Sequence, residues 1–206
     1  MTDEQRIAWL RDTYERILTQ VSQGSGRRIN RLLRYLRESD FYSIPCRHHN
    51  FVGGNAWHQL ETYYYAHCAE VEGYDDEAFA EWQPRWTEGD PMGVAVTCLL
   101  HDVGNAGHDE KTRVDYPQRI RPRHGRKSTY LLIDHLKFDL MFDENMAIIH
   151  HQHKDEDTLR YETPDEEMFS RIWDMPLYRM IQHCDALSID RPLDEEMLVA
   201  WVDSIL

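Results

Sequence analysis

Cysteine is scarce in this sequence, and its spacing is irregular. The 206 residues contain four cysteines, Cys46, Cys68, Cys98 and Cys184, and no two of them form a Cys-x-x-Cys pair. A cysteine zinc site needs such closely paired cysteines, and nothing in this spacing indicates a disulfide framework. We therefore expect a reduced, cytoplasmic protein that is stabilised by a packed core.

Long apolar runs and an excess of positive charge are also missing. No stretch approaches the roughly 18 apolar residues that a membrane span requires, and the polar, acidic start over residues 1–5 is unlike a targeting peptide. The chain has 23 Lys and Arg against 37 Asp and Glu, a formal net charge of −14. This balance disfavours long nucleic acids and anionic membranes as partners, but it allows a local basic pocket for one small anion.

Clear strand patterns and internal repeats are absent, whereas apolar residues recur at helical spacing along most of the chain. The sequence therefore predicts an all-α fold, a helical bundle in a single domain. We expect an N-terminal helix pair in residues 1–40 packed on the core, a central helical region in residues 41–190, and a C-terminal helix of the same domain in residues 191–206. The expected helices cover residues 7–21, 27–37, 55–72, 91–100, 124–140, 143–150, 165–173, 178–185 and 197–205.

Several residues predict where these helices begin. Asp90 followed by Pro91 is typical of a helix start, as is Asp143 before the next apolar run. Residues 163–166, Thr-Pro-Asp-Glu, match a capping box with proline at the first helical position. Residues 74–89 predict a short helix and a loop, and residues 104–123 predict a loop.

Histidine is abundant, and most of the 12 histidines lie between residues 47 and 153. An apolar run delivers the pair His101-Asp102, and a neutral imidazole beside a carboxylate suits a divalent metal with mixed N/O ligands. The long gaps between the other candidates exclude a local zinc knuckle and favour a metal site inside a helical bundle. In chain order the candidate ligands are His58, His101-Asp102, His124, His150 or His151, and Asp185. Of the two adjacent histidines we favour His150, because it continues the apolar face of its predicted helix formed by Met146 and Ile149.

This ordered set, with Leu-Leu-His-Asp-Val-Gly at residues 99–104, resembles the HD-domain superfamily of metal-dependent phosphohydrolases. Residues 48–58, HHNFVGGNAWH, resemble a His-His-x-x-x-Gly-Gly-x-x-x-His motif of a branch that includes 3′-5′ exoribonucleases. Residues 181–188, IQHCDALS, resemble the closing helix of the family, whose aspartate completes the metal site. The resemblance spans about residues 47–188 and implies that residues 41–190 form an HD-type metal-binding helical domain.

The resemblance also implies a ligand set. His58, His101, Asp102 and Asp185 would hold one divalent ion. In members with two ions, His124 and His150 occupy the positions of the additional ligands, and Asp102 would bridge the two. Mn, Fe, Co, Ni, Zn or Mg would all be compatible with imidazole and carboxylate ligands.

The implied activity is that of a hydrolase that cleaves a phosphoester in a nucleotide or another small phosphorylated substrate, by metal-activated water. Arg123 and Arg126, in a basic cluster around His124, would join Asp102 in catalysis by holding the phosphoryl oxygens. Asn105 stands where many family members have a lysine that holds substrate phosphate. The Gly-Tyr-Pro signature of cyclic-dinucleotide phosphodiesterases is missing after His151, which argues against that substrate class.

Two other functions fit a similar pattern. Some HD-type proteins hold two irons and act as oxygenases on inositol or organophosphonates, and oxygen consumption would distinguish them from a hydrolase. A non-catalytic domain that binds a metal or a nucleotide for regulation is the other alternative. The complete ligand set favours an enzyme, and the net charge of −14 favours a small substrate over a long RNA.

Overall fold

The computed structural model describes residues 1–23, 28–72, 91–108, 110–118, 120, 123–152 and 156–206. Within these residues the chain is all-α, as the sequence predicts, and contains no strand. No helix in the described part is long and apolar enough to cross a membrane. The prediction for residues 74–89 and the expected cap at Asp90 lie outside the described residues, as do Arg119 and Arg121, two further arginines of the basic cluster around His124.

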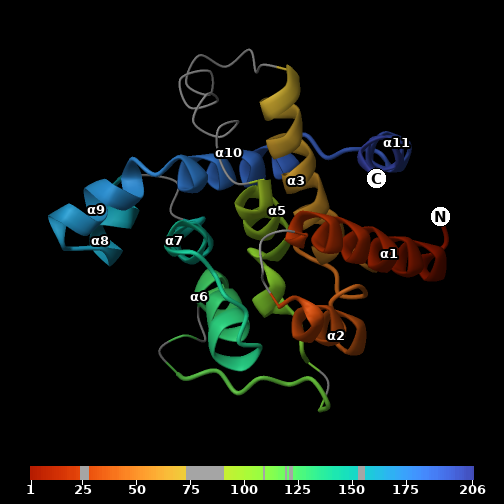
Figure 1. Ribbon diagram of the computed structural model, residues 1–206, viewed down its shortest axis with the longest axis horizontal. Coiled ribbons are helices and arrows are strands. Elements are labelled where there is room, and N and C mark those ends of the chain that lie inside the picture. The colour runs from red at the N-terminus through yellow and green to blue at the C-terminus, as the bar shows by residue number, and fades with distance from the viewer. Residues whose placement is uncertain (24–27, 73–90, 109, 119, 121–122, 153–155) are drawn as a thin grey trace.

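The described residues in the first half of the chain form four helices, and the last of them is central. They are α1 (Asp3–Ser22), α2 (Asn30–Glu38), α3 (Gly54–Glu72) and α5 (Pro91–Leu100). Every residue of α5 from Met92 to Leu100 is buried. This helix packs against α1, α3, α7 and α10 (Figure 1). Because α5 is surrounded in this way, the His101-Asp102 pair at its end is delivered into the interior.

The N-terminal helix pair packs on the core through its apolar faces. In α1 the residues Leu10, Tyr14, Ile17 and Leu18 are buried, as their helical spacing predicts. The Tyr14 hydroxyl donates to the Ala56 carbonyl at 2.7 Å and so ties α1 to α3. The arginines of α2 lie on its exposed face, where Arg37 pairs with Glu15 of α1.

The second half of the chain surrounds the end of α5. It comprises the 3₁₀ turn η1 (Val103–Asn105), α6 (His124–Thr129), the π-helical segment η2 (Tyr130–His135), α7 (Phe142–His150), α8 (Glu156–Glu162), α9 (Glu166–Trp173), α10 (Pro176–Asp190) and α11 (Glu195–Ile205). Helix α10 packs against α3, α5 and α7, and α6 packs against α7 and η1. These contacts bring five segments that carry candidate ligands together at one place.

The helix expected over residues 124–140 ends earlier, at His135. Its second half is π-helical, with the Leu136 N–H donating to the Leu131 carbonyl. Lys137 then adopts a left-handed conformation with φ of 55°, and the Phe138 N–H donates back to the Leu132 carbonyl. This pattern closes a helix, so residues 138–140 lie outside it.

Two predicted helix starts are displaced, and one helix was not predicted. Asp143 lies in the first turn of α7, after Met141 at the cap. The cap of α9 is Asp165, whose carboxylate accepts from the Met168 N–H, so Thr163 does not cap that helix. Helix α8, a short helix with one buried residue, Leu159, has too little apolar periodicity to be predicted.

Candidate metal centre

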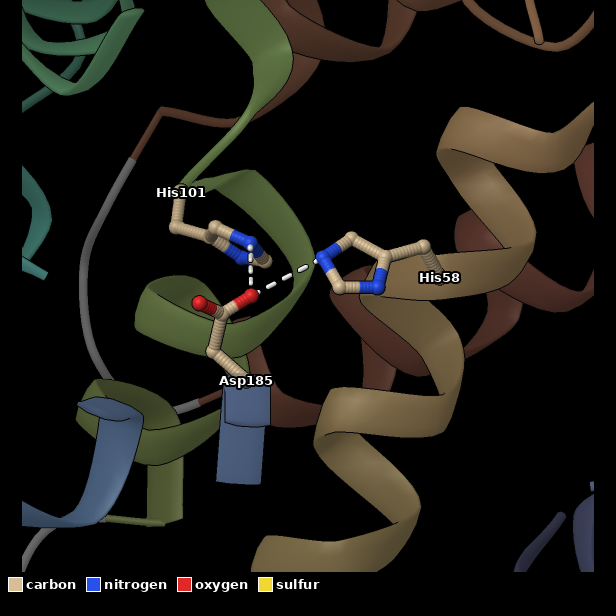
Figure 2. A group of neighbouring side chains, drawn as sticks. All are labelled: His58, His101 and Asp185. Atoms are coloured by element: carbon tan, nitrogen blue, oxygen red, sulfur yellow. Dashed lines mark ion pairs between the residues drawn. The ribbon is translucent and has the colours of Figure 1, made fainter. Parts of the chain in front are cut away.

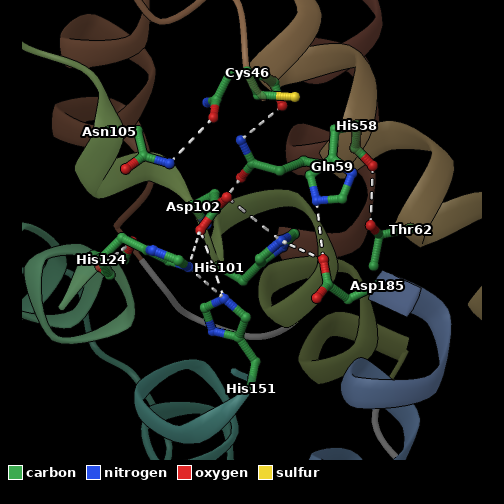
Figure 3. A network of polar contacts seen from close by, with 12 residues as sticks. Cys46, His58, Gln59, Thr62, His101, Asp102, Asn105, His124, His151 and Asp185 are labelled. Atoms are coloured by element: carbon green, nitrogen blue, oxygen red, sulfur yellow. Dashed lines mark hydrogen bonds and ion pairs between the residues drawn. The ribbon is translucent and has the colours of Figure 1, made fainter. Parts of the chain in front are cut away.

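Five segments of the chain bring the imidazole and carboxylate groups of the candidate ligands together in one cluster (Figure 3). His58 comes from α3, and His101 and Asp102 follow α5 directly. His124 begins α6, His151 caps the C-terminus of α7, and Asp185 lies in α10. The prediction that ligands come one per helix to a site inside the bundle therefore agrees with this arrangement.

The first group of ligand atoms consists of His58, His101 and Asp185 (Figure 2). Asp185 Oδ1 lies 2.9 Å from His58 Nε2 and 3.6 Å from His101 Nε2. All three residues are buried. Two nitrogens and one oxygen within 4.8 Å of one another form a set that could hold a metal ion.

The second group consists of His101, Asp102 and His151, and His124 lies outside this group but next to Asp102 (Figure 3). Asp102 Oδ1 is 3.3 Å from His124 Nε2 and 3.6 Å from His151 Nε2. His101 Nε2 lies 4.0 Å from Asp102 Oδ2. His101 thus belongs to both groups, and the two groups are contiguous.

The hydrogen bonds of the outer ring nitrogens orient these imidazoles. His101 Nδ1 lies 2.9 Å from the Cys98 carbonyl, and His151 Nδ1 lies 2.7 Å from the Ile148 carbonyl. A carbonyl can only accept, so Nδ1 carries the proton in both rings and Nε2 is directed at the cluster. His58 Nδ1 is likewise held by the Ser188 hydroxyl at 2.9 Å. Such outer contacts are typical of histidines that bind metals.

Buried polar atoms in the cluster lack hydrogen bonds, and these atoms indicate a cation. His101 Nε2 and Asp102 Oδ1 are both buried and make no hydrogen bond. His124 Nε2 and His151 Nε2, by contrast, lie within hydrogen-bond distance of each other, at 3.1 Å. An unsatisfied buried group such as His101 Nε2 or Asp102 Oδ1 costs about 1–3 kcal/mol, which a bound ion would remove. The residues present therefore fit a divalent metal.

The histidines and carboxylates of the cluster shift one another's pKa values. Burial raises the pKa of Asp102, but the imidazoles of His101, His124 and His151 outweigh burial and lower it below its usual value. Burial likewise raises the pKa of Asp185, but His101 and His58 outweigh it and lower this pKa well below the usual range. Burial lowers the pKa of His101, whereas Asp102 and Asp185 raise it, to about 9. Burial and then the charge of His101 lower the pKa of His151 to about 4, so this ring is neutral and able to coordinate.

The structure brings His151, rather than the favoured His150, into the cluster. The fully buried face of α7 contains Glu144, Ala147 and Ile148, and His151 continues it one turn further. Met146 and Ile149, from which the preference for His150 was derived, are only half-buried. His150 is buried as well, but it belongs to neither group of ligand atoms.

Arg123 and Arg126 do not reach the cluster. Both guanidinium groups contact the same Glu162 Oε2, that of Arg126 at 3.3 Å. Neither arginine lines the cavity described below. The carboxylate that engages them comes from α8, a helix that the sequence analysis did not predict.

A cavity of about 580 Å³ opens beside the cluster. Asp102, Asp185, His58, His124 and His151 form one part of its wall. The remainder of the wall is formed by Arg47, His48, Asn55, Asn105, His108, Gln152, Ile44, Pro45, Cys46 and Ile189. Among the described residues Arg47 is the single Lys or Arg in the cavity lining. Its place directly before His48 is the one sequence feature that could have indicated its role in the cavity.

Two glycines of the sequence motifs, Gly54 and Gly104, stand where a larger residue would clash with a neighbouring segment. A Cβ on Gly54 would lie 1.8 Å from the His49 carbonyl oxygen, so the loop before α3 can pack against the helix start only if this residue is glycine. A Cβ on Gly104 would lie 2.5 Å from the Ser128 nitrogen. Gly104 therefore allows α6, which begins with His124, to approach the turn that follows Asp102.

A second buried ion pair lies next to the cluster. His49 Nε2 contacts Glu61 Oε2 at 2.7 Å, and the other oxygen of Glu61 accepts from Trp57 Nε1 and from the Leu193 N–H, both at 2.9 Å. Burial lowers the pKa of His49, but the contacts with Cys46 and Glu61 outweigh it and raise this pKa to about 9. The pair holds the loop before α3 against the helix that supplies His58.

We expect Glu61→Gln to destabilise the metal-free protein by about 3 kcal/mol, because removal of one partner leaves a buried group unpaired. The glutamine oxygen keeps the two N–H donors, so the change removes the charge and the acceptor for His49. The pKa of His49 rises from ~6.5 in the unfolded chain to about 9 in the fold. The stabilisation is therefore complete below pH ~6.5 and is lost as the pH rises through about 9.

Urea denaturation of the wild type and of Glu61→Gln across this pH range measures the effect. The exposed Glu38→Gln substitution is the matched control. A stability difference that grows with pH, or one no larger than that of the control, would contradict the ion pair.

Comparisons with models of protein families, with curated proteins and with solved structures find no match for this chain. The site is accordingly defined by its own geometry. It is a buried cluster of histidine and aspartate side chains, in an all-helical fold, that could hold a metal ion, and it is compatible with a site of the HD type.

Proposed function

We propose that this protein is a metal-dependent phosphohydrolase of the HD type, which cleaves a phosphoester bond in a nucleotide-sized substrate. The observation that carries the proposal is that His58, His101 and Asp185 form one group of candidate ligand atoms and that Asp102 lies in the adjoining group, with His101 Nε2 and Asp102 Oδ1 buried and without hydrogen bonds. The HD-type resemblance assigns these four residues to one metal. His58, the His101-Asp102 pair and Asp185 come from distant parts of the chain, so no local motif accounts for their proximity.

The second group supports a two-ion site. His124 and His151 both face Asp102 Oδ1, so in a two-ion site Asp102 would be the residue shared by both ions (Figure 3). Here His151 takes the position for which His150 was expected. A bound divalent ion would lower the pKa of a coordinated water toward neutrality and offset charge on the phosphoryl oxygens.

The cavity supports a small substrate. Its volume of about 580 Å³ lies within the range of ligand sites, which is ~300–1,000 Å³. Arg47 is the cation available in the described lining for a phosphate oxygen, since Arg123 and Arg126 are engaged by Glu162. Asn105 adds an amide at the position of the usual lysine, and it donates to Asn55 at 3.4 Å. We propose that Arg47, rather than Arg123 or Arg126, binds the phosphoryl group.

The test combines metal analysis with a substrate panel. Purified protein is analysed for bound metals, stripped with a chelator, and reconstituted in turn with Mn, Fe, Co, Ni, Zn and Mg. Each form is assayed on nucleotides, phosphomonoesters and phosphodiesters. We expect hydrolysis that disappears with the chelator and returns with at least one ion. Metal binding without hydrolysis under any ion would contradict the proposal, and oxygen consumption by the iron form would favour the oxygenase alternative.

A further inference from the structure

A histidine that no metal group contains stands in the wall of the same cavity. His108 lies in the segment after η1, and its side chain is 72% exposed. It belongs to neither ligand group. It lines the cavity together with His58, Asp102 and Asp185.

Asp40, which follows α2, fixes the position of this histidine. Asp40 Oδ2 lies 2.9 Å from His108 Nδ1 and accepts from the His108 N–H at 3.3 Å, while Oδ1 accepts from the Gly107 N–H at 2.6 Å. One carboxylate thus holds both the backbone and the ring of His108. Gly107 makes this turn possible through its positive φ of 85°.

The contact determines which ring nitrogen faces the substrate. An ionised carboxylate can only accept, so Nδ1 carries the proton that it donates to Asp40. The other ring nitrogen, Nε2, makes no hydrogen bond or ion pair within the described part of the chain. An exposed imidazole normally samples several rotamers, and a charged partner from another segment that restrains it in a cavity wall indicates a role toward the ligand of that cavity.

We propose that His108, oriented by Asp40, donates the proton to the leaving-group oxygen during phosphoester cleavage. The inference rests on the proposed phosphohydrolase function. In the step, a water oxygen bonds to phosphorus, the bond from phosphorus to the leaving oxygen breaks, and the Nε2 proton of the imidazolium passes to that oxygen. The proton released by the attacking water returns to solvent, from which His108 is reprotonated. One water is consumed, and no oxidant or reductant is needed.

No other histidine in the cavity wall combines these features. His58, His124 and His151 direct Nε2 into the ligand cluster. His48 makes no hydrogen bond or ion pair with a described residue, so nothing holds its ring. A sugar or alkyl hydroxyl is a poor leaving group as its anion, and an acid placed beside it contributes typically ~10²–10⁴-fold in rate.

The test compares two substrates that differ in the leaving group. They are thymidine 5′-(p-nitrophenyl phosphate), whose nitrophenolate departs without a proton, and the dinucleotide thymidylyl-thymidine, whose leaving group is a sugar hydroxyl. We expect His108→Gln to lose about 100-fold on the dinucleotide and little on the nitrophenyl ester. Asp40→Asn, which changes a positioning residue, should show a smaller loss of the same kind. Metal content should be unchanged in both.

The outcomes separate the two claims. Wild-type enzyme that hydrolyses neither of these diesters nor any phosphomonoester with any ion contradicts the phosphohydrolase function itself. If the wild type cleaves only phosphomonoesters, the same comparison is made with thymidine 5′-phosphate and p-nitrophenyl phosphate, which differ in the leaving group in the same way. An active wild type in which His108→Gln affects both esters equally, or neither, overturns the assignment of His108 alone. His135→Gln, an exposed histidine of η2 outside the cavity, is the control and should behave as wild type on both substrates.

Discussion

Asp102→Asn is expected to remove bound metal and hydrolytic activity together. Asp102 has one oxygen facing His124 and His151, and its other oxygen on the side of His101. An amide keeps the shape of the side chain but is a much weaker ligand than a carboxylate, and a bridging residue would serve both ions. We expect activity to fall by more than about 100-fold, because even changes to groups that only support metal ligands cost 10–100-fold.

The measurement is metal content by elemental analysis, together with the hydrolysis rate at saturating metal. Circular dichroism should show that the variant keeps its helices, since asparagine has the same size and shape as aspartate. His135→Gln is again the control, because it removes one imidazole at an exposed position. A variant with full metal content and wild-type turnover would disprove the assignment of Asp102.

Local patterns predicted the helices well where one face of a helix is buried along its full length. The apolar spacing in α1 and α2 matches their buried residues, and the continuous apolar run of α5 matches its burial on all sides. The same reasoning failed at ends that depend on a single backbone conformation. The left-handed Lys137 ends the helix that begins at His124, and lysine is not a residue type that marks such a position.

Some features of the candidate site could likewise be predicted from the sequence and others could not. The order of the candidate ligands along the chain could be predicted, because each of them lies next to residues that the core requires. Contacts between side chains of distant segments could not be predicted. Glu162 engages Arg123 and Arg126 from a helix with little periodicity, and Asp40 reaches His108 across 68 positions. Neither carboxylate belongs to a motif, so neither partnership has a sequence signal.

His151→Gln should lose metal, whereas His150→Gln should retain it. The sequence favoured His150, because Met146 and Ile149 looked like the inner face of the helix. In the structure His151 continues the buried Ala147 and Ile148 face. If His124 and His151 both coordinate beside Asp102, glutamine at position 151 removes one imidazole ligand.

We expect His151→Gln to bind at least one ion fewer, or to bind it at least about 10-fold more weakly, and to lose activity accordingly. His150→Gln replaces an equally buried ring one position away, so the general cost of a polar change in α7 is common to both variants. Thermal unfolding of the metal-free proteins measures that shared cost. Metal titration then isolates the part that belongs to coordination, because only a ligand changes the difference in stability between the metal-bound and metal-free forms. If His150→Gln abolishes this difference and His151→Gln preserves it, α7 presents the other histidine to the metal, and the bridging geometry around Asp102 is wrong.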